Sequence, residues 1–408
     1  MTECATTAAW EPAYAPRVHG MRASEIRELL SVLDRPGIVS FAGGIPDPAL
    51  FPRVQAQAAF ASILGDATHA RVGLQYSRSE GYPPLRQWIV AHMGRLGVAC
   101  EEDNVVITAG SQQGLEFLAR LLLSPGDTAL VAAPTYLGAL QAFAAYEPRY
   151  DALGLEQENR TPRSYADAAR AGGGRVRLAY VVPDFANPTG ESLSLAARER
   201  LLDLAAELDV PVIEDSAYAA LRFEGESMPS ITALEIARRG SIDKARAIYC
   251  GTFSKVLSPG LRVGWIVAAK PLIRRLVLVK QACDLNSATI NQMVMYRLAA
   301  ALFDAQVAAA CSHYRKRRDA MVRALARYMP HGVHWTRPKG GLFVWVRFPE
   351  QMDGRILLDR ALAEQRVAFV PGAAFFFEEC GRNTARLSYS LPSEGEIVEG
   401  VARLARLI

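Results

Sequence analysis

The sequence predicts an α/β protein: a mainly parallel sheet covered by helices in a large domain, then a smaller α+β domain at the C-terminal end. In the middle of the chain, short apolar runs alternate with amphipathic stretches, which indicates strand–helix–strand crossovers and hence parallel strands. Past residue 290 this alternation stops and one long helical stretch follows. A length of 408 residues suits two coupled domains better than one.

The predicted strands of the large domain are short apolar runs, and the predicted helices have apolar residues three and four positions apart. Strands are expected at residues 104–108, 128–132, 178–182, 210–213, 247–251 and 263–268. Helices are expected at residues 112–123, 138–145 and 195–208.

The C-terminal part has a different pattern. Residues 291–328 contain no Pro or Gly, and the stretch is too long for a crossover helix but suits a spine between domains. A strand is expected at 341–347 and a last helix at 394–407. We therefore expect an N-terminal arm with part of the small domain at 1–55, the large domain at 56–290 and the small domain at 291–408.

Charge and composition exclude several classes of protein. The chain has 46 Lys and Arg against 42 Asp and Glu, a net charge of +4, without the clustered basic stripe typical of nucleic-acid binding. A charged fraction of 22% also argues against a largely disordered chain. No secretory signal and no apolar run of about 20 residues is found, so we expect a cytoplasmic protein without a membrane partner.

Cysteine and histidine give no sign of a metal site. The six cysteines lie far apart without a zinc-type pairing, so buried free thiols are expected. His331 and His334 are three residues apart but have no third ligand nearby, so no metal is predicted.

The segment most informative about function is GTFSK, which ends at Lys255 and is followed by Arg262. A lysine directly after a strand, flanked by hydroxyl groups, suits a cofactor that carries an aldehyde and a phosphate. The amine would form a Schiff base, and Thr252, Ser254 and Arg262 could hold the phosphate. Taken alone, the segment is equally compatible with a surface loop and an ordinary lysine.

Three further segments carry polar groups suited to such a cofactor. Asp215 ends a predicted strand, at the sheet edge where ligands bind in open α/β sheets, and could keep a pyridine nitrogen protonated. Tyr218, and Asn187 in an NPTG turn, could reach the ring hydroxyl. Residues 109–114 (AGSQQG) join a strand to a helix whose N–H groups could cradle phosphate. Each segment alone could also be an ordinary turn or cap.

In this order the four segments resemble the fold-type I aminotransferases, which use pyridoxal 5'-phosphate. The resemblance runs from residue 24 to the C-terminal helix, and it is closest to the 2-aminoadipate and kynurenine/aminoadipate aminotransferases. The segments similar to that subgroup are 24–30 (SEIRELL), 40–46 (SFAGGIP), 74–85 (LQYSRSEGYPPL) and 385–390 (ARLSYS). The resemblance implies an aspartate-aminotransferase-like fold and a homodimer with shared active sites.

The resemblance also implies roles for single residues. Lys255 matches the Schiff-base lysine and general base, and Asp215 matches the partner of the pyridine nitrogen. Asn187 and Tyr218 match the partners of the ring hydroxyl, and Tyr136 matches a residue stacked on the ring. Phosphate contacts are implied for Ser111, Gln112, Thr252, Ser254 and Arg262, and for Tyr76 from the other subunit.

For the substrate, the resemblance implies that Arg386 clamps the α-carboxylate, assisted by Asn187 and the Gly44 backbone. It also implies substrate-binding roles for Ser24 and for Arg27, whose guanidinium would reach a distal carboxylate. A solvated arginine on a helix is the alternative for Arg27. The aromatic run at 375–377 is expected in loop and core packing, with a substrate pocket as the alternative.

The predicted function is therefore transfer of an amino group between an L-amino acid and a 2-oxo acid. One pair is expected to be 2-oxoglutarate and glutamate, with an aminoadipate-, aromatic- or branched-chain-type donor. A β-lyase or decarboxylase with the same cofactor is the first alternative. The second is a transcription regulator with an aminotransferase-like domain, which would need a winged-helix module before residue 24.

Overall fold

The protein is described by a computed structural model that covers residues 10–15, 17–18, 37–156 and 160–408. Ser24 and Arg27, both predicted to bind substrate, lie outside these residues.

The largest sheet has seven strands in the order β2-β8-β7-β6-β5-β3-β4. All neighbouring strands are parallel except β8, which runs antiparallel to both β2 and β7. The strands are β2 (Val105–Thr108), β3 (Thr128–Ala132), β4 (Arg149–Leu153), β5 (Val176–Val181), β6 (Val212–Asp215), β7 (Ala247–Thr252) and β8 (Gly264–Val267). The prediction of a mainly parallel sheet is confirmed.

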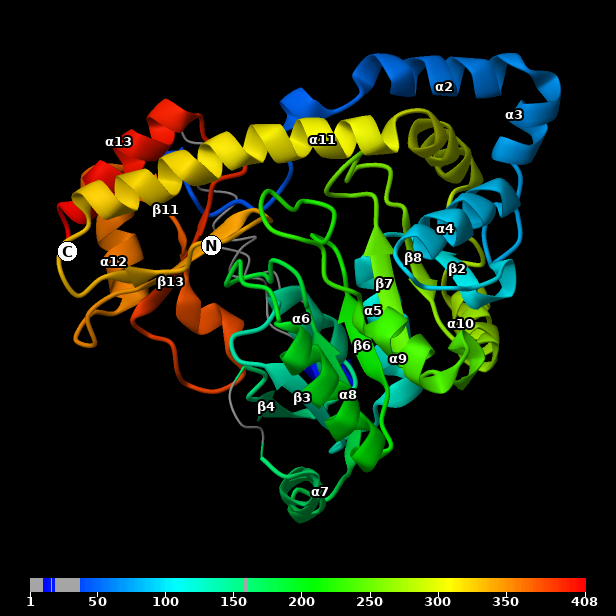
Figure 1. The fold of residues 1–408 in the computed structure, drawn as a ribbon, viewed down its shortest axis with the longest axis horizontal. Helices are drawn as coiled ribbons and strands as arrows, with labels where there is room; N and C mark the ends of the chain where they lie inside the picture. The colour runs from blue at the N-terminus through cyan, green and yellow to red at the C-terminus, as the bar shows by residue number, and fades with distance from the viewer. Residues whose placement is uncertain (1–9, 16, 19–36, 157–159) are drawn as a thin grey trace, which may run out of the picture.

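Helices cover both faces of this sheet (Figure 1). Side chains alternate along each strand, so Leu178 and Tyr180 of β5 pack on one side and Ala179 and Val181 on the other. The first side is covered by α5 (Ser111–Leu122), α6 (Leu137–Ala144) and α10 (Lys270–Cys283). The second side is covered by α7 (Pro162–Ala171), α8 (Leu195–Leu208) and α9 (Ile231–Arg239).

A second, antiparallel sheet has the order β12-β13-β10-β9. Its strands are β9 (His334–Trp335), β10 (Phe343–Arg347), β12 (Val370–Pro371) and β13 (Thr384–Ser388), with helices α12 (Gly354–Arg360) and α13 (Glu394–Ala405) nearby. The early strand β1 (Val39–Ser40) pairs with β11 (Val367–Ala368). A segment before residue 55 thus joins the C-terminal part, and the domain boundaries themselves stay a prediction.

Helix α11 (Thr289–Tyr328) has 40 residues and lies along the length of the molecule (Figure 1). It packs on α13 and on three early helices, α2 (Arg53–Gly65), α3 (Ala67–Gly73) and α4 (Pro83–Arg95). Among the described residues it is the single helix long and apolar enough to cross a membrane, with a window of mean hydropathy 1.3 that is 33% buried. Core helices of soluble proteins meet the same criterion, and the packing of α11 on both ends of the chain fits that case.

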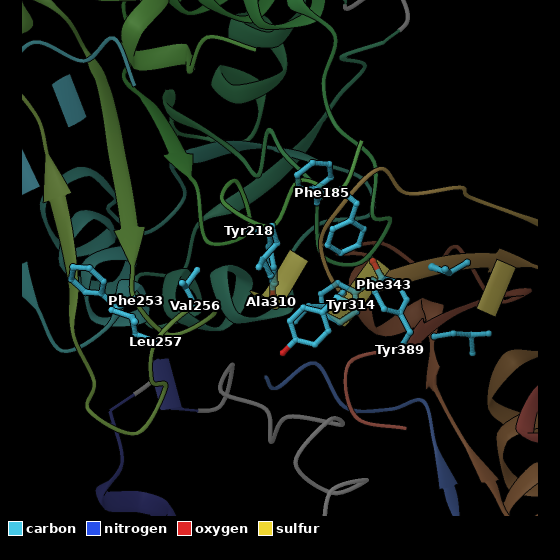
Figure 2. Close-up of a cluster of buried hydrophobic side chains, with 14 of the residues drawn as sticks. Phe185, Tyr218, Phe253, Val256, Leu257, Ala310, Tyr314, Phe343 and Tyr389 are labelled. Atoms are coloured by element: carbon cyan, nitrogen blue, oxygen red, sulfur yellow. The ribbon is translucent and has the colours of Figure 1, made fainter. Parts of the chain in front are cut away.

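The two sheets and α11 meet in a hydrophobic cluster (Figure 2). Tyr218, just after β6, meets Phe343 of β10 edge to face, with ring centroids 5.6 Å apart. Tyr314 of α11 and Tyr389 after β13 are also fully buried there. This cluster fixes how the two sheets lie relative to each other.

The expectation of buried cysteines is only partly right. Of the described cysteines, all of which are free, Cys250 is buried, whereas Cys283 and Cys380 are exposed. Cys283 is the last residue of α10, and Cys380 lies in the loop before β13, so neither is held in a packed layer. Within the described part of the chain, no group of three His, Cys, Asp or Glu residues could hold a metal.

Candidate active site

The predicted site residues gather where the carboxyl ends of β5, β6 and β7 face the second sheet. Asp215 is the last residue of β6, and Lys255 follows β7 by three residues. Asn187 lies in the turn after β5, and Arg386 reaches the site from β13. Because the carboxyl ends of parallel strands meet at one edge, residues as far apart in the chain as Asn187 and Lys255 can share one crevice there.

Lys255 carries an amine that is easy to deprotonate. Its Nζ donates to the carbonyl oxygen of Gly44 at 3.3 Å and lies 5.5 Å from the ring centroid of Tyr218. Burial and then the charge of Arg386 lower the pKa of Lys255 to about 8, although Asp215 acts in the other direction. At neutral pH this amine is therefore a better base or nucleophile than an ordinary lysine.

Asp215 is 3% exposed and has one satisfied oxygen. Its Oδ2 accepts a hydrogen bond from the Tyr180 hydroxyl at 2.9 Å, whereas the buried Oδ1 has no partner among the described residues. Burial raises the pKa of the Asp215 carboxyl to about 6, against the hydrogen bond from Tyr180 and the charge of Lys255. An unpartnered buried oxygen is costly, and the protonated nitrogen of a pyridine ring would supply the missing donor.

Sequence reasoning missed Tyr180. It lies within β5, where a tyrosine between aliphatic residues reads as core, and its fully buried ring meets Phe143 edge to face at 5.7 Å. Its partner Asp215 is 35 residues further along the chain. The one available signal was a hydroxyl group within the apolar run at 178–182.

The loop between β2 and α5, called the cradle below, brings Arg262 close to the start of a helix, an arrangement that suits an anion. Gly110 has a φ of +81°, and a Cβ there would lie 2.2 Å from Nη2 of Arg262. That Nη2 donates to the carbonyl oxygen of Ala109 at 3.2 Å. Gly264 of β8 packs so closely that a Cβ would lie 2.7 Å from the nitrogen of Ser111. Glycines at these positions let Arg262 and the strands approach the start of α5.

Two further predicted phosphate contacts, Thr252 and Ser254, lie at the carboxyl end of β7. Thr252 faces Gly264 across the sheet, and its hydroxyl donates to Oγ of Ser254 at 2.9 Å. Together with the unpaired first N–H groups of α5 and the Arg262 guanidinium, these hydroxyls suit a phosphate dianion.

Tyr136 and Gln112 hold each other at the start of α6. The Tyr136 hydroxyl donates to Oε1 of Gln112 at 3.3 Å, and Nε2 of Gln112 donates to the carbonyl oxygen of Gly138 at 2.6 Å. Burial and the charge of Asp215 raise the pKa of Tyr136 to about 12. The Gln112 side chain is thus engaged, and its backbone N–H is the group left to bind phosphate.

Arg386 is 2% exposed and holds its guanidinium in a fixed frame. Nη1 donates to Oδ1 of Asn187 at 2.9 Å, and Nη2 donates to the carbonyl oxygens of Ala42 and Gly43 at 2.9 and 2.6 Å. Burial lowers the pKa of Arg386 to about 10, which leaves it charged at neutral pH. No carboxylate of the described residues pairs with it, so this buried cation still needs an anion.

The aromatic run at 375–377 serves packing and also forms one wall of the site. Phe375 is fully buried, and its ring lies 5.8 Å from that of Trp345 and 5.1 Å from the Arg386 guanidinium carbon. Phe343 lies 4.4 Å from the same carbon. Phe377 packs on Tyr150. The expectation of loop and core packing therefore fits.

Tyr76 lies apart from this cluster within the single chain. Its side chain is 78% exposed, whereas the flanking residues Gln75 and Ser77 are hydrogen-bonded to the Thr289 hydroxyl at the start of α11. A contact of Tyr76 with a second subunit would cover it.

Fold and site together define a fold-type I enzyme with an aspartate-aminotransferase-like architecture that uses pyridoxal 5'-phosphate. The family model described as "Aminotransferase class I and II" matches residues 39–404, and the chain belongs to this family. It is therefore a pyridoxal-phosphate-dependent aminotransferase, and amino acids are its substrates.

Relatives of known name cover almost the whole chain. The chain is 42% identical to a 2-aminoadipate transaminase of Thermus thermophilus, over 98% of this chain and 97% of that protein. It is 38% identical to aromatic-amino-acid aminotransferase 1 of Thermococcus litoralis, over 99% and 96%. A crystal structure of an α-aminoadipate aminotransferase from Thermus thermophilus, complexed with N-(5'-phosphopyridoxyl)-L-leucine, superposes with a TM-score of 0.87 at 40% identity, covering 98% of both chains.

Proposed function

We propose that this aminotransferase binds the α-carboxylate of its amino acid at Arg386 and removes the Cα proton with Lys255. The observation that carries the proposal is the buried guanidinium without a carboxylate partner. Gly44 lies between the two groups: its oxygen accepts from Lys255, and a Cβ there would be 3.6 Å from Nη2 of Arg386. An amino acid held at Arg386 thus presents its Cα near the Lys255 amine.

The cofactor, when bound, supplies an electron sink for the charge left on Cα. Asp215 would accept a hydrogen bond from its pyridine nitrogen through Oδ1, and Asn187 and Tyr218 would hold its ring hydroxyl. Lys255 would carry the cofactor covalently between turnovers and act as general base during them, a role suited to a pKa of about 8. Tyr136 would stack on the ring. The phosphate would be held by Ser111, Gln112, Thr252, Ser254 and Arg262, with Tyr76 reaching across a homodimer.

For the substrates, we propose 2-oxoglutarate and glutamate as one pair. The other donor would be of the aminoadipate, aromatic or branched-chain type. Two named relatives act on 2-aminoadipate or aromatic amino acids, and one solved relative holds a leucine adduct. Arg27 would bind a distal carboxylate beside Ser24. We also propose a cytoplasmic enzyme that has the domain boundaries expected from the sequence.

The test is a set of half-reactions with purified enzyme in the pyridoxal form. Each L-amino acid is added without acceptor, and both the cofactor spectrum and the released acid are followed. We expect conversion to the amine form of the cofactor with one equivalent of 2-oxo acid, fastest for one donor type. Release of ammonia or carbon dioxide instead would favour a β-lyase or decarboxylase. The matched control is Lys255→Ala, which should bind amino acids but not convert them.

A further inference from the structure

A buried lysine lies outside the substrate site, beside the first turn of α5. Lys280 of α10 is completely buried, 25 residues beyond Lys255. Its Nζ donates to Oδ1 and Oδ2 of Asp284 at 3.0 and 2.9 Å, to Oγ of Ser287 at 2.9 Å and to Oε1 of Gln113 at 3.2 Å. A buried ammonium with so many acceptors is held in one place.

Gln113 connects this lysine to the cradle. It is the third residue of α5, and its Oε1 also accepts from the backbone N–H of Ala109 at 2.8 Å. Its Nε2 donates to Oδ2 of Asp284 at 2.8 Å. Because an ammonium only donates and a carboxylate only accepts, Lys280 and Asp284 permit a single orientation of the Gln113 amide.

The two peptide groups on either side of the Ala109 Cα are consequently both held. Gln113 accepts from the N–H of Ala109, and Arg262 donates to its carbonyl oxygen. The next residue, Gly110, has the positive φ that turns the chain into α5. Any rotation about the backbone bonds of Ala109 would redirect the N–H groups of Ser111 and Gln112, which are the first two residues of α5.

The Lys280–Asp284 pair suits positioning better than stabilisation. The Lys280 side chain is buried, and the Asp284 side chain is 26% exposed. Removing the ammonium from water costs free energy that often cancels the Coulomb gain of such a pair, so the pair adds little net stability. Asp284 also neutralises the charge of Lys280, so little of it is left to attract a phosphate directly. What the pair provides is a fixed frame for Gln113.

We propose that Lys280 is a positioning residue for the cofactor phosphate, acting through Gln113 on the Ala109–Gly110 turn. The inference rests on the proposed phosphate site at the start of α5. It goes further by assigning a task to a buried group that touches neither cofactor nor substrate.

The test compares two ligands of the apoprotein, pyridoxal 5'-phosphate and pyridoxal, which lacks the phosphate. In Lys280→Met we expect the Kd for pyridoxal 5'-phosphate to rise roughly tenfold or more, while the Kd for pyridoxal changes by less than about twofold. Amide hydrogen exchange of residues 109–113 should become faster. Lys270→Met is the matched control, because Lys270 lies on the same helix and is ion-paired with Glu101 at 2.7 Å. It should change neither affinity.

A second variant, Gln113→Met, leaves the Lys280–Asp284 pair whole and should reproduce the phosphate-specific loss. If Lys280→Met does not fold, Gln113→Met alone tests the positioning role. Equal losses for both ligands, or no loss in either variant, would overturn the positioning role. Wild-type apoprotein that binds both ligands equally tightly would instead reject the proposed phosphate site itself.

Discussion

The two ionisable groups at the centre of the site are both shifted toward their neutral forms by burial. Asp215 has its pKa raised to about 6, and Lys255 has its pKa lowered to about 8. Their mutual attraction opposes both shifts without cancelling them. A protonated pyridine nitrogen would stabilise the charged form of Asp215, so we expect the cofactor to relieve a cost that the apoprotein carries.

That cost should appear in the pH dependence of apoprotein stability. Folded Asp215 holds its proton up to about pH 6, whereas the ordinary carboxyl of an unfolded chain loses it near 3.8. Between these values the folded state binds more protons, so wild-type apoprotein should lose stability as pH rises, by an amount on the order of 3 kcal/mol. Asp215→Asn removes this contribution. In urea unfolding, the free energy of unfolding of the variant minus that of the wild type should increase from about pH 4 to 6 and then stay constant. A difference independent of pH would contradict the shifted carboxyl.

Arg386 should matter equally for every amino donor, because it is proposed to bind the carboxylate that all of them share. Arg386→Lys keeps a charge but loses the planar fork that Asn187 and the Gly43 carbonyl hold in place. We expect the kcat/KM of half-reactions to fall about ten- to a hundredfold for acidic, aromatic and aliphatic donors alike. Cofactor affinity, measured in parallel, should be retained. A loss restricted to one donor class would place the α-carboxylate elsewhere.

Arg27 should instead discriminate between donors. If its guanidinium binds a distal carboxylate, Arg27→Gln should lower kcat/KM for aminoadipate and glutamate by about ten- to a hundredfold and spare leucine and aromatic donors. Half-reactions are needed, since 2-oxoglutarate as acceptor in a full cycle would mix both effects. Equal losses for acidic and apolar donors would mean a structural role, and no loss would mean a solvated arginine.

At the scale of the elements, the turn from β2 into α5 gives a prediction with a built-in control. Gly110 and Gly126 both have a positive φ, +81° and +84°, so alanine should strain the backbone at each, by roughly 1–3 kcal/mol. At Gly110 the new Cβ would lie 2.2 Å from the Arg262 guanidinium, whereas at Gly126 no atom lies within 4 Å. Gly110→Ala should therefore also displace Arg262 and weaken binding of pyridoxal 5'-phosphate at least about tenfold. Gly126→Ala should leave this binding unchanged. Equal affinities of the two apoprotein variants for pyridoxal 5'-phosphate would contradict a phosphate site at the cradle.

The sequence predicts best those helices and strands that are buried, because burial requires apolar residues at regular positions. Strands such as β3, and residues 178–181 of β5, are mostly apolar because both of their faces are covered. The edge strand β4, Arg149–Leu153, was missed because its pattern RYDAL is half polar, as an exposed edge allows. The antiparallel direction of β8 could not be predicted either, because the spacing of apolar residues does not reveal the direction of a strand.

The same limit applies to the site. Lys255, Asp215, Asn187 and Arg386 belong to motifs that sequence carries locally, and the fold brings them together. The hydrogen bond from Tyr180 to Asp215 joins two separate strands and has no local signature. Such supporting contacts are fixed by sheet order, which becomes known only with the structure.

At the scale of the whole molecule, the proposed homodimer would place exposed Tyr76 of one chain in the active site of the other, so each active site would need both chains. Lys255→Ala and Tyr76→Ala should each be impaired as homodimers. The two variants are mixed at equal amounts, dissociated and allowed to reassociate, so that half of the dimers should be hybrids. Each hybrid has one complete site, with Lys255 from one chain and Tyr76 from the other. The mixture should therefore regain about a quarter of wild-type activity above the mean of the two parents. The parents mixed without dissociation are the control for simple addition. A fully active monomer in sedimentation experiments, or a reassociated mixture no better than the parental mean, would contradict shared sites and return Tyr76 to an ordinary surface residue.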